Sequence, residues 1–306
     1  MVWSATPTPF TDSLAIDHAS IRRMVDHHDT LGIDGIFLAG TCGEGPWLDG
    51  RQTVELVQST GQANQGRMKL GVQVTENSAA RTLERLELLE QTNYDFAVIA
   101  QPSLFMNATP SRIITYYLDI LDRSPKPVCF YDRGSRPDFP MEPQLLAEIY
   151  AHPKIRIIKD SSRCPIRRKI ALHVRADRDD LALLNGDEFD CFEYFAAGYD
   201  GFMTGGAILS GAYLRRQASA YREGNISQAK EIDQRAQHML KTVYGGDGFS
   251  CWLTGLKHIL VKLGVFSSAA SYLEYPLTED CRNNISRIIR EESEWLQPNT
   301  TASAAA

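Results

Sequence analysis

Short apolar runs alternate with longer amphipathic segments along the first two thirds of the chain. The apolar runs are almost continuous, which is typical of strands in a parallel sheet that is covered on both faces. They predict strands at Val2–Ala5, Gly35–Ala39, Lys69–Val74, Phe96–Ala100, Val128–Tyr131, Ile155–Lys159, Leu181–Asn185 and Gly201–Thr204. The pattern therefore indicates a sheet whose strands are joined by helices.

Segments with a 3.6-residue apolar period lie between these strands and continue after the last one. Helices are predicted at Asp17–Leu31, Arg51–Ala63, Asn77–Gln91 and Ser111–Leu121. We expect Asp17, Asn77 and Ser111 to cap three of them, because their side chains accept hydrogen bonds from the free amides of a first turn. Beyond about residue 225 only helical patterns remain, at Ser227–Val243, Cys251–Leu263 and Glu279–Trp295.

The repeats predict an α/β fold, a (β/α)8 TIM barrel with a C-terminal helical extension. The barrel is expected to span residues 1–224, the helical extension residues 225–297, and a disordered tail residues 298–306. A doubly wound sheet is the competing architecture. It would place a dinucleotide-binding glycine fingerprint after the first strand, and the segment Thr6–Phe10 has none.

Composition narrows the classes of function. The chain is 43% hydrophobic and 23% charged, as in soluble globular proteins. Its net charge of -6 disfavours nucleic acid or a membrane surface as a partner. No secretory signal or membrane span is recognisable, and the cysteines form no C-x-x-C pair, which favours a cytoplasmic protein with reduced thiols. His27 and His28 are adjacent on a predicted helix and point apart, so no metal is expected.

The sixth predicted strand ends in a lysine. In a TIM barrel the chemistry lies at the C-terminal ends of the strands. Strand alternation places Ile155, Ile157 and Lys159 on one side, which would be the barrel interior. An amine there is poorly solvated and can attack a ketone as the free base. The alternative is that Lys159 forms an ion pair with Asp160 at the rim.

Two further strand ends carry candidate groups. Tyr131 closes the fifth strand and could move protons, although a tyrosine at a barrel rim is more often a packing residue. The glycine-rich turn Gly40–Gly45 follows the second strand, and its N–H groups could form an anion nest for a carboxylate. Thr41 adds a hydroxyl that could link to Tyr131.

These segments resemble the dihydrodipicolinate synthase/N-acetylneuraminate lyase family along almost the whole chain. Gly40–Glu44 is similar to the family's G-T-T/S-G-E loop, Phe130–Asp132 to its Y-N strand end, and Ile157–Ser161 to its G-x-K-x-[AST] strand. Gly186–Glu188 and Gly198–Gly201 follow in the order that the family shows.

The resemblance implies a lyase of the class I, pyruvate-dependent aldolase type. Lys159 would form an imine with a 2-keto acid, Tyr131 would be the acid/base, and Thr41 would relay protons. Backbone amides around Thr41, Cys42 and Gly43 would bind the keto acid's carboxylate. No metal or organic cofactor is implied, and the partners would be a small 2-keto acid and an aldehyde. Family members are usually homotetramers, built as dimers of dimers.

The residues that would select the second substrate point in different directions. Arg136 lies five residues after Tyr131, as does the arginine with which dihydrodipicolinate synthases bind the carboxylate of aspartate semialdehyde. It could instead be a solvated arginine beside Asp138, and Arg133 could take the binding role.

Other positions depart from the synthases. Their paired tyrosines after the fourth strand, one of which enters the neighbouring subunit's site, are replaced by a segment with Phe105 and Met106. Cys42 stands for the second threonine of the loop and is a poorer hydrogen-bonding group. Further candidates for substrate binding are Gly186, Asp187 and Glu188, which resemble the sugar-binding loop of sialate lyases, and Thr204 at the end of the eighth strand.

The sequence thus predicts an enzyme that cleaves, condenses or dehydrates a 2-keto-3-deoxy sugar acid or a similar hydroxy-2-keto acid. The closest alternative is 4-hydroxy-tetrahydrodipicolinate (dihydrodipicolinate) synthase. Two other classes compete: a non-catalytic 2-keto-acid sensor on the same fold, and a barrel isomerase that binds phosphate at the glycine-rich segment Phe202–Gly211.

Overall fold

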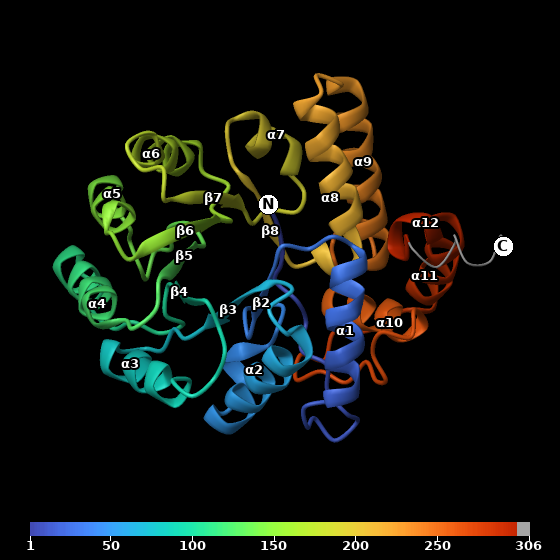
Figure 1. The fold of residues 1–306 in the computed structure, drawn as a ribbon, viewed down its shortest axis with the longest axis horizontal. Helices are drawn as coiled ribbons and strands as arrows, with labels where there is room; N and C mark the ends of the chain where they lie inside the picture. Colours follow the sequence, from blue (N-terminus) through green and yellow to red (C-terminus); the bar gives the residue numbers. More distant parts are fainter. Residues whose placement is uncertain (299–306) are drawn as a thin grey trace.

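The strands close into a barrel. A computed structural model describes residues 1–298, so the predicted tail lies outside the described residues except for Pro298. All neighbouring strands are parallel, and β8 pairs with β1 to complete the ring (Figure 1). The strands are β1 Val2–Ser4, β2 Gly35–Leu38, β3 Lys69–Gln73, β4 Phe96–Ala100, β5 Val128–Asp132, β6 Ile155–Asp160, β7 Ala182–Asn185 and β8 Gly201–Thr204. The TIM barrel is confirmed, and the doubly wound sheet is excluded.

Helices surround the barrel and alternate with its strands (Figure 1). They are α1 His18–Thr30, α2 Gly50–Asn64, α3 Ala79–Leu88, α4 Pro110–Arg123, α5 Pro143–Ala151, α6 Pro165–Ala176, α7 Cys191–Ala196 and α8 Ala207–Arg222. Short 3₁₀ helix η1 Gly45–Trp47 follows the loop after β2. The apolar face of each helix covers the outer face of the sheet, which explains why the strands read as continuous apolar runs.

Helix caps were predicted correctly at one position of three. The Asp17 carboxylate accepts from two first-turn amides of α1. Asn77 and Ser111 are not caps; Ser78 and Thr109 cap α3 and α4 instead. Asn77 accepts a hydrogen bond from the next βα loop. Helix α4 opens with a proline in its first turn, where a missing N–H costs nothing, so the cap must precede that proline.

The barrel interior is filled by inward-pointing side chains, namely Trp3, Ala5, Phe37, Val98, Cys129, Ile157, Leu184 and Met203. Ile157 therefore points inward as predicted, but Ile155 does not: it packs outside the barrel. The pairing of β5 with β6 steps from Val128↔Ile155 to Cys129↔Ile157. The skipped Arg156 forms a bulge that reverses the alternation, and a bulge leaves no trace in the apolar pattern.

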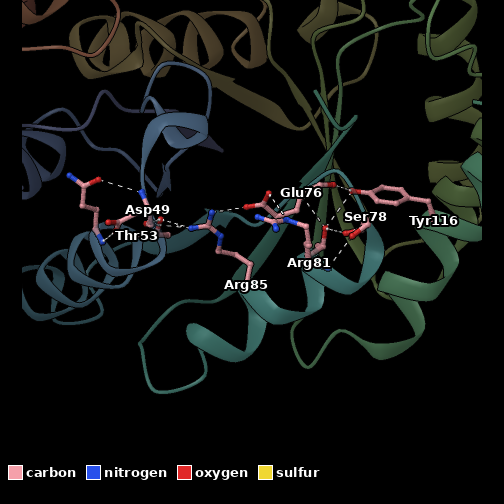
Figure 2. A network of polar contacts seen from close by, with 9 residues as sticks. Asp49, Thr53, Glu76, Ser78, Arg81, Arg85 and Tyr116 are labelled. Carbon is pink, nitrogen blue, oxygen red and sulfur yellow. Dashed lines mark hydrogen bonds and ion pairs between the residues drawn. The ribbon is translucent and has the colours of Figure 1, made fainter. Parts of the chain in front are cut away.

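A polar network joins the loop after β3 to the helices beside it. Figure 2 shows Arg85 of α3 between Thr53 of α2 and Glu76, with hydrogen bonds of 2.8 and 2.6 Å. Tyr116 of α4 donates to the backbone carbonyl of Glu76 at 2.8 Å. Three successive βα units are thereby fixed to one loop, which keeps this part of the barrel's C-terminal face rigid.

The last helices form a second layer beside α1 and α8 rather than a separate lobe (Figure 1). They are α9 Ile226–Val243, α10 Trp252–Lys262, α11 Glu279–Glu291 and α12 Ser293–Leu296. Their apolar side chains share one core with Tyr213 of α8 and Met24 of α1. The predicted single helix Glu279–Trp295 is broken at Glu292, whose carboxylate binds the Tyr213 hydroxyl at 2.5 Å and Arg235 at 2.8 Å. Within residues 1–298, no helix has the length and apolarity that crossing a membrane requires.

Candidate active site

A cavity of about 480 Å³ opens at the C-terminal ends of the strands. It contains seven of the predicted site residues: Thr41, Cys42, Tyr131, Lys159, Gly186, Asp187 and Glu188. They come from the loops and strand ends of β2, β5, β6 and β7, so the fold brings together groups that are up to 147 residues apart in the chain, between positions 41 and 188.

Lys159 lies at the floor of this cavity. It is only 4% exposed, and β6 places it in register with Tyr131 of β5. Its Nζ lies 4.1 Å from the centre of the Tyr131 ring and 5.0 Å from that of Phe37. Asp160 points to the opposite side of the strand, where the Tyr199 hydroxyl donates to it at 2.6 Å. The interpretation of Lys159 as a rim partner of Asp160 is therefore wrong.

Gly186 gives the lysine room. A Cβ at this position would collide with the Ser161 hydroxyl and the Lys159 side chain, so any larger residue here would displace the lysine or the serine. The buried Ser161 hydroxyl lies close enough to Tyr131 to help lower the pKa of its phenol.

The surroundings of Tyr131 lower the pKa of its phenol. Burial alone would raise the pKa of its phenol, but the positive charges of Lys159 and Arg133 and the nearby hydroxyl of Thr41 outweigh burial, so this pKa lies below its usual range. A phenol with a lowered pKa gives up its proton more easily to a reacting oxygen or amine.

The loop after β2 presents backbone donors to the cavity. Within residues 1–298, the N–H groups of Thr41 and Cys42 donate to no protein acceptor. Gly43 lies outside the cavity lining, and its carbonyl accepts from the Thr8 hydroxyl at 2.6 Å. Glu44 closes the turn in the left-handed conformation at a φ of 57°. Free amides in such a turn form a nest for an anion.

Glu44 also ties this loop to the C-terminal helices. Its Oε1 accepts from Lys257 Nζ of α10 at 2.5 Å, and both side chains are fully buried. Its Oε2 accepts from the Ser271 hydroxyl at 2.9 Å and the Tyr272 amide at 2.6 Å. The glutamate of the loop is thus a structural anchor rather than a group that faces the substrate.

The turn after β7 supplies the carboxylates of the cavity. Asp187 is buried, and both of its oxygens accept from Arg163, at 2.7 and 2.9 Å. Glu188 accepts from the Gly206 amide at 2.6 Å. Burial raises the pKa of the Glu188 carboxyl, which favours its protonated form. Asp187 therefore orients Arg163, whereas Glu188 is held by the backbone at the start of α8.

Besides Gly43, three other predicted substrate-binding residues lie outside the cavity lining. Arg136 bonds a backbone carbonyl at 3.1 Å and Asp138 at 3.2 Å. Phe105 packs edge-on against Phe139, with ring centres 5.3 Å apart. Thr204 is buried at the end of β8, and its hydroxyl has no partner among the described residues.

The cavity also has a wall that the sequence did not reveal. Besides Ala5, Ser161 and Gly205, it is lined by Arg163 and Phe189, and by Tyr244, Gly248, Phe249, Trp252 and Tyr275 of the C-terminal segment. These residues carry no motif, and only the packing of the last helices on the barrel brings them to the site. No group of three His, Cys, Asp or Glu side chains within residues 1–298 is arranged to hold a metal ion.

Comparison with known proteins places the chain in a family. A sequence model described as the Dihydrodipicolinate synthetase family matches residues 1–292. The chain belongs to this family. Dihydrodipicolinate synthetase family enzymes are lyases of the pyruvate-dependent aldolase type, so this protein is an enzyme of that type.

Individual family members are only distantly similar. A 4-hydroxy-tetrahydrodipicolinate synthase of Pseudoalteromonas atlantica is 26% identical over 288 residues, which cover 92% of this chain and 94% of that protein. The dihydrodipicolinate synthase structure of Bacteroides thetaiotaomicron superposes with a TM-score of 0.85 at 22% identity, over 95% of this chain and 97% of that one. A prophage protein of the family from E. coli K12, in complex with pyruvate, gives a TM-score of 0.83 at 18% identity, over 95% and 98% of the two chains.

Proposed function

We propose that this enzyme cleaves or forms a hydroxy-2-keto acid, such as a 2-keto-3-deoxy sugar acid, through an imine on Lys159. The single observation that carries the proposal is the position of Lys159: a buried amine 4.1 Å from the Tyr131 ring centre, in a cavity that also holds free backbone donors. Neither a metal nor an organic cofactor is needed, because the protonated imine is itself the electron sink.

The proposed reaction starts with the keto acid. Its carboxylate binds the free amides of Thr41 and Cys42. Lys159 attacks the keto carbon, and loss of water leaves the imine. Tyr131 exchanges the protons of these steps, and Thr41 connects it to the cavity.

The second stage makes or breaks a carbon–carbon bond. In the direction of condensation, C3 of the pyruvate imine loses a proton to give an enamine, which attacks the aldehyde carbon. The aldehyde oxygen takes up a proton and becomes the 4-hydroxyl, and water releases the product and regenerates Lys159. Cleavage is the reverse of these steps. Dehydration would follow if the enamine, formed by loss of the C3 proton, instead expelled the neighbouring hydroxyl, which takes up a proton and leaves as water.

The alternatives are separated by particular contacts. The names of the relatives favour 4-hydroxy-tetrahydrodipicolinate synthase. Against it, Arg136 is engaged by Asp138 and lies outside the cavity lining. A phosphate-binding isomerase is disfavoured because the Gly206 amide, at the start of α8, already binds the Glu188 carboxylate.

The proposal is tested by trapping the imine. Incubation with pyruvate and sodium borohydride is expected to add one reduced pyruvate unit, and peptide mapping should locate it at Lys159. Adduct formation followed by release of pyruvate from 2-keto-3-deoxy acids supports an aldolase. An adduct without turnover of any 2-keto acid indicates a sensor, and the absence of an adduct would contradict the imine.

Tyr131→Phe is expected to lower kcat/KM by roughly 10²–10⁴-fold, the usual contribution of a positioned acid/base. The variant keeps the ring that packs edge-on against Phe37 at 6.1 Å, so it should remain folded. Steady-state release of pyruvate measures the effect, and the thermal unfolding midpoint is the control. If the variant retains more than about a tenth of the activity, the protons travel by another route.

A further inference from the structure

Arg163 lies where two cavities meet. It comes from the loop between β6 and α6, four residues after Lys159. The cavity that holds Lys159 and a neighbouring cavity of about 410 Å³ share four lining residues, Arg163, Asp187, Phe189 and Phe249. A guanidinium in this position faces whatever part of a substrate extends away from the imine.

Asp187 holds the guanidinium by one edge only. Its oxygens bind Nε at 2.7 Å and Nη2 at 2.9 Å. The aspartate is itself fixed, because Asn185 bonds its backbone N–H and carbonyl, each at 2.7 Å. The other edge of the guanidinium group consists of Nη1 and the second N–H of Nη2. This edge donates to no acceptor within residues 1–298. An arginine oriented in this way is prepared to bind a planar anion with that free edge.

The backbone of Arg163 is strained in order to present this side chain. Its φ of +53° lies in the left-handed region. A non-glycine residue pays about 1 kcal/mol or more for this conformation, and such outliers gather at functional sites. The side chain is 66% exposed and covers no core, so burial of apolar surface does not account for the strain.

The cavity holds two cations, one of which is already paired with a carboxylate. Its cations are Lys159 and Arg163, and its carboxyl groups are those of Asp187 and Glu188. The bond to Arg163 neutralises Asp187. Burial raises the pKa of the Glu188 carboxyl, and the hydrogen bond from the Gly206 amide opposes this shift only in part. The carboxylate of the keto acid balances Lys159, so it is the free edge of the Arg163 guanidinium, and not the net charge of the cavity, that offers a place for a second anion.

We propose that Arg163 binds a second carboxylate, at the end of the substrate remote from the keto acid, so that the preferred substrates are dicarboxylic hydroxy-2-keto acids. The inference rests on the proposed aldolase function and specifies its substrate class. In condensation, C3 of the pyruvate enamine bonds to the carbonyl carbon of an aldehyde acid, whose oxygen takes a proton to become a hydroxyl. The carboxylate of that aldehyde would remain on the free edge of Arg163.

The test compares aldehydes that differ only in their terminal group. Glyoxylate is matched with glycolaldehyde, and succinate semialdehyde with 4-hydroxybutanal, each with pyruvate as the donor. We expect the wild-type enzyme to use at least one acid with a kcat/KM about 10–100-fold above that of its alcohol, the scale of a charge-assisted bidentate contact. Product formation is followed by mass spectrometry.

Variants of Arg163 should remove this preference. Arg163→Gln is expected to lower kcat/KM for the acid by about 10–100-fold, mainly through KM, and to leave the alcohol within about 3-fold. Arg163→Lys keeps the charge but not the fork and should fall between the two. Arg168→Gln is the matched control, because Arg168 lines the neighbouring cavity but not that of Lys159.

Each outcome decides between the two proposals. Equal use of acids and alcohols by the wild-type enzyme overturns the role of Arg163, and this measurement needs no variant to fold. An equal loss on both substrates in Arg163→Gln overturns it as well. Borohydride trapping of pyruvate is run in parallel. If the wild-type enzyme forms no adduct, the proposed function is wrong. If it forms an adduct but shows no preference for acids, only the proposed role of Arg163 is wrong.

Discussion

Lys159→Ala is expected to reduce turnover of 2-keto acids by at least roughly 10⁴-fold, the scale on which enzymes lose activity when a nucleophile that forms a covalent intermediate is removed. The variant should also give no adduct with pyruvate and borohydride. Steady-state kinetics and intact-mass spectrometry measure the two effects. Within residues 1–298, no other lysine lines the cavity, so none of these residues offers a second amine to replace it.

The control separates charge from nucleophilicity. Lys159→Arg keeps a cation beside the Tyr131 and Phe37 rings but cannot form an imine, since a guanidinium is not deprotonated in proteins. It should be as inactive as the alanine variant while its unfolding midpoint stays near that of wild type. Residual activity above about a hundredth of wild type in either variant would mean that the reaction does not pass through Lys159.

Lys257→Met is expected to lower the free energy of unfolding by about 3–5 kcal/mol, because it leaves the Glu44 carboxylate buried without its counter-ion. Burial lowers the pKa of the Lys257 ammonium, only partly offset by Glu44, so the charge itself is costly to bury. Urea unfolding at constant pH measures the loss. The loop after β2 should loosen too, which would weaken binding of the keto acid.

Two comparisons test this explanation. The double variant Glu44→Gln, Lys257→Met removes both charges and should regain most of the lost stability. Lys241→Met breaks an ion pair of 3.0 Å with the exposed Asp247 and should cost no more than about 1 kcal/mol. A similar cost for Lys257→Met and Lys241→Met would show that the buried pair contributes little.

The barrel could be predicted because its pattern is local. Apolar runs such as those of β4 and β6 record burial on both faces of a parallel sheet, and the turns between them set the repeat. Lys159 and Tyr131 could be found for the same reason, since each stands at a strand end where a barrel places its chemistry. Their register across β5 and β6 then follows from the fold alone.

The features of the site that the sequence did not predict depend on contacts between segments that are distant in the chain. Whether Ile155 points inward is decided by a bulge, which changes no residue type. Glu44 looks like an ordinary loop acid until Lys257, 213 residues away, is placed against it. Arg163 belongs to the site because Asp187 turns it there, and Phe249 because the last helices fold back. No spacing along the chain encodes such pairs.

The bond between Glu44 and Lys257 also sets an order of events during synthesis. The barrel strands, including the two that carry Lys159 and Tyr131, are complete once residue 204 has been made. The far wall of the cavity, however, extends to Tyr275. Until that segment leaves the ribosome, the carboxylate of Glu44 has neither its lysine nor the amides of residues 272 and 273. A nascent chain can therefore contain Lys159 and Tyr131 in finished strands and still lack the cavity wall that its last helices supply.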